Sequence, residues 1–451
     1  MTIIEQPPGV SPALDWSFPG RSEHQLPNGL TVLVYNCPGQ FVVAASLLFD
    51  VPLTAEPRQV EGVAGLVGRC LTLGAGDRSA EQFADAVALC GADMDAAAAP
   101  DGFAVRLSVP VAQLGGGLRL LADTVSAPRF DQAEFEQQKR LRLQEIDQAA
   151  SYPQHVAVEQ LNAALFGAAR AARPVGGAAE TVERVGLPDV SAYVSRLLQP
   201  TSATLVIAGD FAGLDPTDAV VNAFGDWQRE AGQAEEGQPP TVIAGPRIQL
   251  VDWPDAPQAT IRLAGRGITR ADVRWPAMFV ANYAVGGNFS SRLNTVLREE
   301  KGFTYGASSS LDTGRHGGLF TMSTAVRSDA AAEAVNDITT ILQESGGTIT
   351  DVEVSTAVRA ATDSAALGFE RAEAVVGRVE MLLSERLPLD HVDANLARIR
   401  AVNAESANAA YRDAVDPTAF TVVVVGDAAA LRGPLAALGY GTLEAITPSR
   451  R

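Results

Sequence analysis

The strongest constraint on the fold is an internal repeat, marked by a strand pattern that ends in Gly-Asp and occurs twice in the 451 residues. SATLVIAGD ends at Asp210 and AFTVVVVGD ends at Asp427, which gives an offset of 217 residues (427 minus 210). Two further pairs share this offset and begin comparable segments: Phe103 with Phe320, and Val63 with Val280. The repeat predicts an α+β protein of two homologous halves, each an antiparallel-rich sheet backed by helices.

Apolar patterning and turn residues predict the elements of the first half. Strands are expected at 30–35, 41–50, 104–110 and 202–210. Helices are expected at 59–73, from Ser79 onward, at 114–125 and at 131–149. The run Gly115–Gly117 is expected to be a turn or a helix approach, because it lacks the Lys-Ser/Thr of a phosphate loop. A glycine-rich segment of the second half is expected to be a hairpin loop: Gly314, His316, Gly317 and Gly318.

A composition shift predicts where the chain divides. Residues 229–246 are rich in Gly, Gln, Glu and Pro, so they are expected to form a linker that buries little apolar surface. The predicted units are a proline-punctuated arm at 1–20, a first α/β domain at 21–228 and a second at 247–445.

Composition and charge limit the partners and the compartment. The chain is 47% hydrophobic with a formal charge of −18, so nucleic acid and anionic membranes are not expected partners, whereas a basic or unfolded peptide would be tolerated. Three cysteines without CxxC spacing indicate neither a disulfide framework nor a cysteine-rich metal site. With no secretory signal pattern and no apolar run long enough to span a membrane, a cytoplasmic location is expected.

The stretch from Gly286 to Ser310 is predicted to be a capped helix, a glycine stop and a strand. Ser290 and Ser291 are suited to the N-cap, and Gly302 is suited to a left-handed stop. An apolar face is formed at helical spacing by Leu293, Val296 and Leu297. Arg298 falls in the last helical turn and Tyr305 opens the strand. By themselves, this arginine and tyrosine are typical of a surface residue and a packing residue.

The same stretch resembles the insulinase/pitrilysin family of inverted-motif zinc peptidases. The match is carried by Leu297, Arg298, Glu299, Gly302 and Tyr305, and the wider resemblance runs from about Gln25 to about Gly426. It implies that the Tyr305 hydroxyl donates to the oxyanion of the tetrahedral intermediate and that Arg298 holds a backbone carbonyl of the peptide.

The family's zinc helix is present without its ligands. The positions of His-x-x-Glu-His read Gly65, Gly68 and Arg69, and neither glycine nor arginine ligates zinc. The four histidines are scattered, and none pairs at ligand spacing: His24, His155, His316 and His391. We therefore expect no metal and no cofactor in this chain.

Glu145 corresponds to the family's third ligand, 76 residues after Arg69. Glu145 is either one more carboxylate on a solvated helix or the ion-pair partner of Arg69. In the second case Arg69 would occupy the vacated metal position, and the charged groups of Arg69 and Glu145 would lie within about 4 Å of each other.

The family's substrate-pairing edge strand corresponds to one short segment: Gly91, Ala92, Asp93, Met94 and Asp95. Such a strand binds an extended peptide as an additional strand. Asp95 replaces the asparagine that is usual in the family.

The resemblance implies one half-shell of a clamshell peptidase. The expected function is the non-zinc subunit of a heterodimeric metallopeptidase, inactive alone, whose homologous partner supplies His-x-x-Glu-His and zinc while this chain supplies Arg298 and Tyr305. Two alternatives are a structural subunit of a larger assembly and a peptide-binding subunit of a peptide-maturation pathway.

Overall fold

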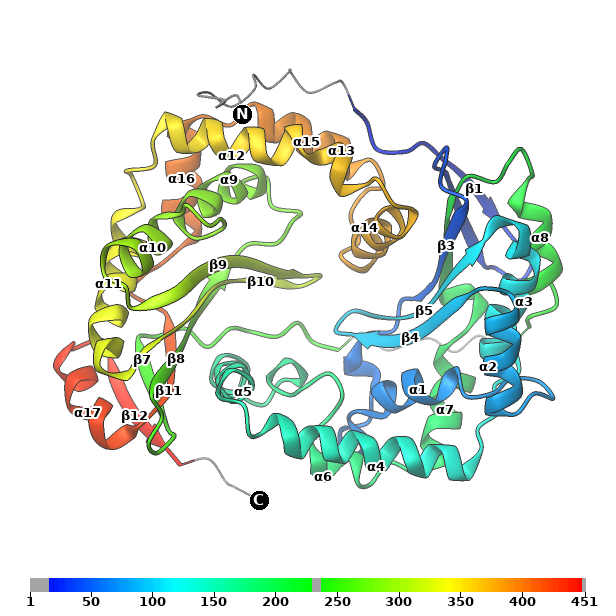
Figure 1. Cartoon of the computed structure of the whole chain (residues 1–451), viewed down its shortest axis with the longest axis horizontal. Coiled ribbons are helices and arrows are strands. Elements are labelled where there is room, and N and C mark those ends of the chain that lie inside the picture. The colour runs from blue at the N-terminus through cyan, green and yellow to red at the C-terminus, as the bar shows by residue number, and fades with distance from the viewer. Residues whose placement is uncertain (1–15, 229–236, 448–451) are drawn as a thin grey trace, which may run out of the picture.

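The computed structural model describes residues 16–228 and 237–447. Most of the predicted N-terminal arm and part of the predicted linker, at 1–15 and 229–236, therefore lie outside the described residues. The chain forms two halves side by side, each a sheet with helices against it (Figure 1). Of the helices in the described ranges, none combines the length and apolar character of a transmembrane span.

The first sheet has six strands in the order β1-β2-β6-β3-β5-β4. Their bounds are β1 Arg21–Gln25, β2 Thr31–Asn36, β3 Val42–Phe49, β4 Asp93–Ala99, β5 Gly102–Pro110 and β6 Ala203–Gly209. Only β2 and β6 pair in parallel, and the other neighbours are antiparallel. The central strands read as nearly continuous apolar runs because helices cover both faces of the sheet.

The second sheet also has six strands, in the order β12-β7-β11-β8-β10-β9. Their bounds are β7 Arg247–Asp252, β8 Gln258–Gly267, β9 Thr304–Gly314, β10 Gly317–Arg327, β11 Thr421–Gly426 and β12 Thr442–Ile446. Five strands correspond between the sheets, with β4 and β9 at equivalent open edges. At the other edge the sheets differ, because β1 is antiparallel to β2 whereas β12 is parallel to β7.

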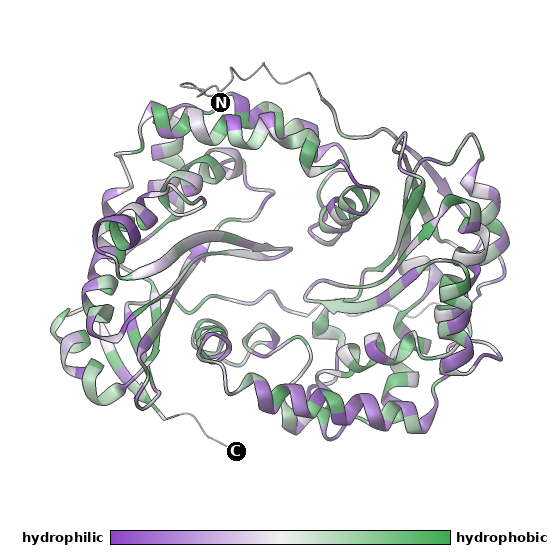
Figure 2. Cartoon of the chain, viewed as in Figure 1, coloured by the Kyte–Doolittle hydropathy of each residue, from purple (hydrophilic) through white to green (hydrophobic). Residues whose placement is uncertain are grey.

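Helices of the first half are α1 Val63–Leu71, α2 Ala80–Leu89, α3 Leu114–Ser126, α4 Gln132–Ala149, α5 Pro153–Phe166, α6 Ala179–Val182, α7 Leu187–Leu197 and α8 Pro216–Phe224. Helices of the second half are α9 Trp275–Val285, α10 Arg292–Asn294, the π-helix η6 Thr295–Glu300, α11 Ala331–Glu344, α12 Asp351–Asp363, α13 Ala365–Gly368, α14 Ala372–Ser384, α15 His391–Arg400, α16 Ala404–Ala414 and α17 Ala428–Ala437. Hydrophobic residues concentrate on the strands and the inward helix faces, whereas α4 is largely hydrophilic (Figure 2).

The predicted fold class is confirmed, and the repeat is real, but its offset is not uniform. Phe103 and Phe320 are fully buried near the starts of the corresponding strands β5 and β10. Val280 lies in the middle of α9, whereas Val63 begins α1, so this part of the repeat prediction was wrong. Loops between corresponding elements differ in length and therefore shift the register of the repeat.

Several local predictions were confirmed and others needed correction. Ser79 caps α2 through a capping box with Gln82. The hairpin loop predicted around His316 joins β9 to β10. The helix expected at 59–73 is shorter, because Gly62 adopts a left-handed conformation just before α1. The run Gly115–Gly117 lies inside the first turn of α3, where a Cβ on Gly117 would press against Leu107 and Val109 at 3.1 Å.

One helix of each half packs on the sheet of the other half. Helix α5 packs on the second sheet, where Ala157 and Leu161 join a buried cluster with Val423. Helix α14 packs on the first sheet, where Val379 and Leu382 join a cluster with neighbours from β2, β3 and β6. Both helices lie on the inner side of the molecule, between the sheets (Figure 1).

Candidate functional site

Arg298 lies on an unusually wide helical turn. The short helix α10 continues into the π-helix η6, which holds Arg298 at its fourth position and is followed by Gly302 in the left-handed conformation. Ser291 is the N-cap residue, but its side chain accepts from the Asn294 amide rather than from a backbone N–H, so the predicted serine cap bond is not formed. π-turns of this kind occur frequently at functional sites.

The Arg298 guanidinium is stacked on an aromatic ring. Its central carbon lies 4.0 Å from the ring centroid of Phe289, and its Nη1 lies 3.0 Å from a carboxylate oxygen of Glu299. The Nη1 atom is buried and makes no hydrogen bond within the described residues, because the Glu299 contact lacks hydrogen-bond geometry. Phe289 is itself 66% exposed, so the stacked pair lies at the surface. Nothing in the sequence pattern singled out Phe289.

Tyr305 lies in a bulge of the open edge strand β9. Ala307 pairs with Thr324 and Thr304 pairs with Val326, so the regular pairing of β9 with β10 is interrupted at Tyr305. A bulge redirects side chains and ends regular pairing. Tyr305 is 92% exposed, and its hydroxyl has no hydrogen-bond partner among the residues that the structure describes. The strand begins at Thr304, one residue before the predicted start at Tyr305, and the Tyr305 side chain is open to solvent.

Two buried asparagines tie this loop and strand together. The Asn294 side chain donates to the carbonyl of Ala307 and accepts from its N–H, both at 2.9 Å. Asn282 donates to the carbonyl of Ser309 and accepts from its hydroxyl at 2.7 Å. These bonds hold β9 against α9 and α10 and so position both Arg298 and Tyr305. The sequence pattern did not indicate these asparagine bonds; the one local signal is that Asn294 directly follows the apolar Leu293.

The degenerate zinc helix α1 is packed too closely for a metal site. A Cβ on Gly68 would lie 2.7 Å from the carbonyl oxygen of Ala96 in β4, and one on Gly65 would lie 3.2 Å from Gly176. Real Cβ atoms do not approach backbone at 2.7 Å, so α1 packs against β4 too closely for any side chain at position 68 without a shift. Within the described ranges no three His, Cys, Asp or Glu side chains are grouped to hold a metal ion.

Arg69 and Glu145 form the predicted ion pair. The Arg69 Nη2 atom donates to the Glu145 carboxylate at 2.5 Å, and Arg142 lies 3.5 Å from the same oxygen. Burial raises the pKa of Glu145, but the hydrogen bonds and charges of Arg69 and Arg142 outweigh it, and the net pKa lies below its ordinary value. The Arg69 and Glu145 side chains are 30% and 46% exposed, so neither charge is buried and the pair does not compensate a large desolvation cost.

Two other ion pairs near α1 are more deeply buried, and sequence reasoning missed both. Glu56 is paired with Arg170 at 2.9 Å and also accepts from the N–H groups of Gly62 and Ala64 at the start of α1. Glu61 is paired with Arg173. Burial raises the pKa of Glu56 in spite of Arg170. These carboxylates therefore serve to anchor α1 rather than to ligate metal.

The predicted substrate strand is an open edge. Among the described strands β4 pairs with β5 alone, and its residues alternate between exposed and half-buried. Asp95 shares Arg106 with Glu380 of α14, at 3.2 and 2.8 Å respectively. Gly91 and Ala92 lie in the turn before the strand, and Asp93 begins it.

Two matching α+β halves, with Gly65, Gly68 and Arg69 on helix α1 of the first and a half-buried Arg298 and an exposed Tyr305 in the second, agree with a half-shell of the clamshell peptidase class. Residues 31–179 match the family described as insulinase (peptidase family M16), and residues 184–361 match the one described as peptidase M16 inactive domain. The chain belongs to this insulinase family of peptidases.

Relatives and solved structures agree with this assignment. An uncharacterized zinc protease of Streptomyces coelicolor is 24% identical over 404 residues, 86% of each chain, and one of Mycobacterium leprae is 26% identical over 391 residues, 85% of this chain and 87% of the other. A peptidase M16 inactive domain from Pseudomonas fluorescens has a TM-score of 0.83 at 21% identity, covering 90% of this chain and 98% of the other. A chain of complex III2 from Candida albicans has a TM-score of 0.74 at 16% identity, covering 92% and 100%. At these identities the structures establish the fold alone.

Proposed function

We propose that this chain is the non-zinc subunit of a heterodimeric metallopeptidase. In this proposal a homologous partner provides His-x-x-Glu-His, zinc and the activated water. This chain provides Arg298 to hold a peptide carbonyl and Tyr305 to donate to the oxyanion. It is inactive when alone.

One contrast carries the proposal. The family's zinc positions are occupied by Gly65, Gly68 and Arg69, and α1 packs closely against β4, whereas Tyr305 is open to solvent and Arg298 is half-buried with its Nη1 atom unpaired within the described residues. A tyrosine that is 92% exposed gains little from packing, so its place at a bulge of the open edge strand β9 favours a role toward a ligand. Transition-state stabilisation by one such donor is typically worth about 100- to 1,000-fold in rate.

The open edge of β4 adds to the proposal. An extended peptide would pair with its free N–H and C=O groups. Asp93 has no ion-pair partner within the described residues, and the chain carries a net charge of −18, so a peptide with basic residues suits this edge.

A structural role is the second candidate. It is favoured by the similarity to a chain of complex III2, with a TM-score of 0.74 over 92% of this chain. A subunit that only scaffolds an assembly, or only binds a peptide, would need no exposed tyrosine hydroxyl for catalysis.

Co-expression separates these functions. The chain is purified alone and together with a relative that carries His-x-x-Glu-His, and each sample is assayed for zinc content and for cleavage of a fluorogenic peptide library. The proposal expects no stoichiometric zinc and no cleavage by the chain alone, and cleavage by the complex well above that of the relative alone. Zinc bound by the isolated chain, or a complex no more active than the relative alone, would contradict it.

A further inference from the structure

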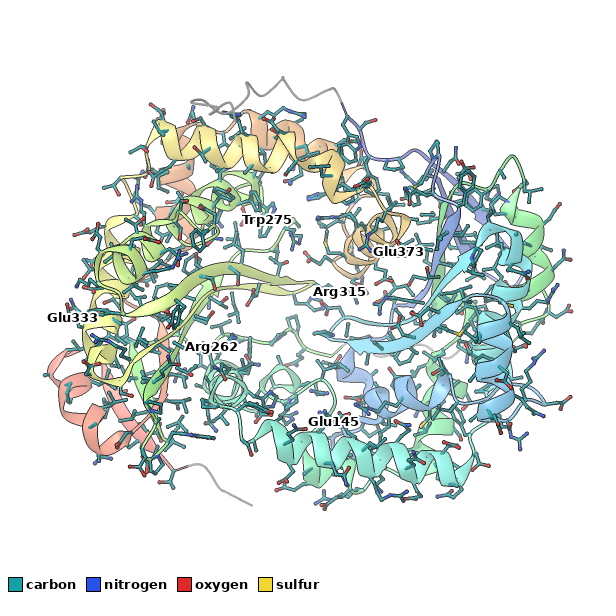
Figure 3. The ribbon with its side chains drawn as sticks, viewed as in Figure 1. Glu145, Arg262, Trp275, Arg315, Glu333 and Glu373 are labelled. Carbon is teal, nitrogen blue, oxygen red and sulfur yellow. The ribbon has the colours of Figure 1, made fainter. Side chains whose placement is uncertain are left out.

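A cavity of about 530 Å³ lies where the two halves meet. We call it the central cavity; its walls are the inner face of α5, the segment 169–175, residues 52–54 and the β9–β10 hairpin loop 312–319. Arg315 marks the tip of this hairpin near the middle of the molecule (Figure 3). Binding sites for small ligands commonly measure roughly 300–1,000 Å³ and occur at domain junctions.

The walls of the central cavity are mostly apolar. Val158 and Phe166 on α5, Leu53 and Leu319 supply aliphatic and aromatic surface, and prolines add to it. Asn162 lies in the same wall, is half-buried, and its amide has no hydrogen-bond partner within the described residues. An amide carries both a donor and an acceptor, so Asn162 can pair with a polar group of a ligand in the cavity.

Among the described residues around the central cavity, the arginines are paired but two of the carboxylates are not paired with a lysine or arginine. Its arginines are each compensated, since Arg170 pairs with Glu56, Arg173 with Glu61, and Arg315 with Asp50.

Of the three carboxylates of the wall, Asp101 accepts from the Arg315 N–H, whereas Glu159 and Asp312 have no lysine or arginine partner in the part of the chain that the structure describes. Glu159 contacts His155 at 3.1 Å, and Asp312 accepts from the hydroxyls of Ser310 and Thr321. Asp312 is exposed and the Glu159 side chain is 42% exposed, so both carboxylates of the cavity wall are accessible to a ligand. An apolar wall that also carries unpaired carboxylates favours a ligand with an apolar body and one positively charged end.

We propose that the central cavity binds a small ligand with an apolar body and a primary ammonium group. The apolar body lies against Val158, Phe166 and Leu319, and the ammonium group is held by Glu159 and Asp312. The Asn162 amide supplies an oxygen for a further hydrogen bond. Because its walls come from both halves, a bound ligand stabilises their association. This inference is independent of the proposed peptidase role.

The test uses the full chain and two probes that share one apolar body. Calorimetric titration with 4-phenylbutylamine is expected to give one site with a Kd of about 1 mM or tighter, and 4-phenylbutyrate is expected to bind at least about fivefold more weakly. At about ten times Kd, the amine is expected to raise Tm by about 1–2 °C. Equal binding of the two probes, or no binding of the amine, would overturn the proposal.

Variants locate the site. Glu159→Gln and Asp312→Asn are each expected to weaken 4-phenylbutylamine by about fivefold and to leave 4-phenylbutyrate unweakened, whereas Glu370→Gln, an exposed carboxylate outside the cavity, is expected to change neither. Val158→Trp fills the cavity and is expected to remove binding of both probes; its fold is checked by circular dichroism. Unchanged amine binding in both carboxylate variants would place the ligand elsewhere. Binding of N-acetyl-leucyl-lysine amide without binding of the free amine would indicate a peptide subsite and overturn a small-ligand site.

Discussion

Arg298 and Tyr305 are positioned by two different local features of the backbone, a π-turn and a β-bulge. The π-turn of η6 brings the arginine over Phe289, and the bulge of β9 turns the tyrosine outward. Asn282 and Asn294 connect the two by hydrogen bonds to β9. These bonds hold the backbone beside both residues, which would preorganise them for the proposed oxyanion role.

Tyr305→Phe tests the proposed oxyanion donor. The ring and the backbone are kept while one hydroxyl is lost, so kcat of the reconstituted complex should fall by at least about 100-fold with little change in KM. Arg298→Ala should also raise KM, because a carbonyl contact exists in the ground state as well. The measurement is steady-state cleavage of a fluorogenic peptide, with gel filtration to verify assembly. A Tyr305→Phe complex that assembles and cleaves within about threefold of wild type would favour the scaffold role.

The ion pair between Arg69 and Glu145 should contribute little stability. Both side chains are partly exposed, so Glu145→Gln should lower the free energy of unfolding by less than about 1 kcal/mol at pH 7. The folded-state pKa of Glu145 is below its ordinary value, so its contribution is present above the unfolded pKa and is lost as pH falls through the folded pKa.

Urea titrations of wild type and Glu145→Gln at pH 7 and at pH 3 measure this difference. It should be smaller at pH 3, where the carboxyl is protonated in much of the unfolded state. Glu136→Gln, on the same helix α4, is the control for the removal of a carboxylate that has no arginine partner within the described residues. A loss of several kcal/mol at pH 7 in Glu145→Gln would mean that the pair is structurally central.

At the scale of single elements, α1 packs closely against β4. The two glycines of the degenerate motif let the helix backbone approach its neighbours, and the Glu56 and Glu61 ion pairs anchor the start of the helix. Close backbone packing of this kind depends on the absence of a Cβ.

Gly68→Ala should therefore destabilise the protein. A methyl group would meet the Ala96 carbonyl oxygen at 2.7 Å, and overpacking of this kind costs about 1–3 kcal/mol even though alanine favours a helix. Gly377→Ala in α14 is the matched control, because no atom lies within 4 Å of the added Cβ, and it should stabilise by about 0.5–1 kcal/mol. Chemical denaturation of wild type, Gly68→Ala and Gly377→Ala measures the free energy of unfolding of each. A stabilising Gly68→Ala would show that α1 is free to move away from β4.

At the scale of the whole molecule, the two halves are joined by exchange of α5 and α14. Arg106 of β5 binds Glu380 of α14 through two nitrogens, and Arg315 of the β9–β10 hairpin binds Asp50 and Asp101 of the first half. Each sheet therefore relies on a helix from the other half to cover its inner face.

Leu382→Ala should loosen the first sheet although the residue belongs to the second half. Leu382 is fully buried in one cluster with Leu33, and such a truncation costs about 2–5 kcal/mol. Hydrogen exchange followed by mass spectrometry should show faster exchange in β2, β3 and β6. Leu342→Ala in α11, equally buried in the second core, should instead affect β8 and β10. If Leu382→Ala changed hydrogen exchange in the second sheet only, helix α14 would not stabilise the first sheet.

The amino-acid sequence by itself determined the two-half α+β architecture, most strand and helix positions, and the loss of zinc ligands at Gly65, Gly68 and Arg69. These are local properties, since apolar periodicity and side-chain chemistry act over a few residues. The sequence also predicted the contact between Arg69 and Glu145, through the spacing of the family motif.

Only the tertiary structure decided how these parts are joined. The exchange of α5 and α14, the asparagine bonds to β9, the bulge at Tyr305 and the carboxylates in the wall of the central cavity all depend on residues far apart in the chain. No local pattern encodes such contacts, because a helix face is equally apolar whichever sheet it covers. Packing of the two sheets against these helices selects the partner, and with it the site.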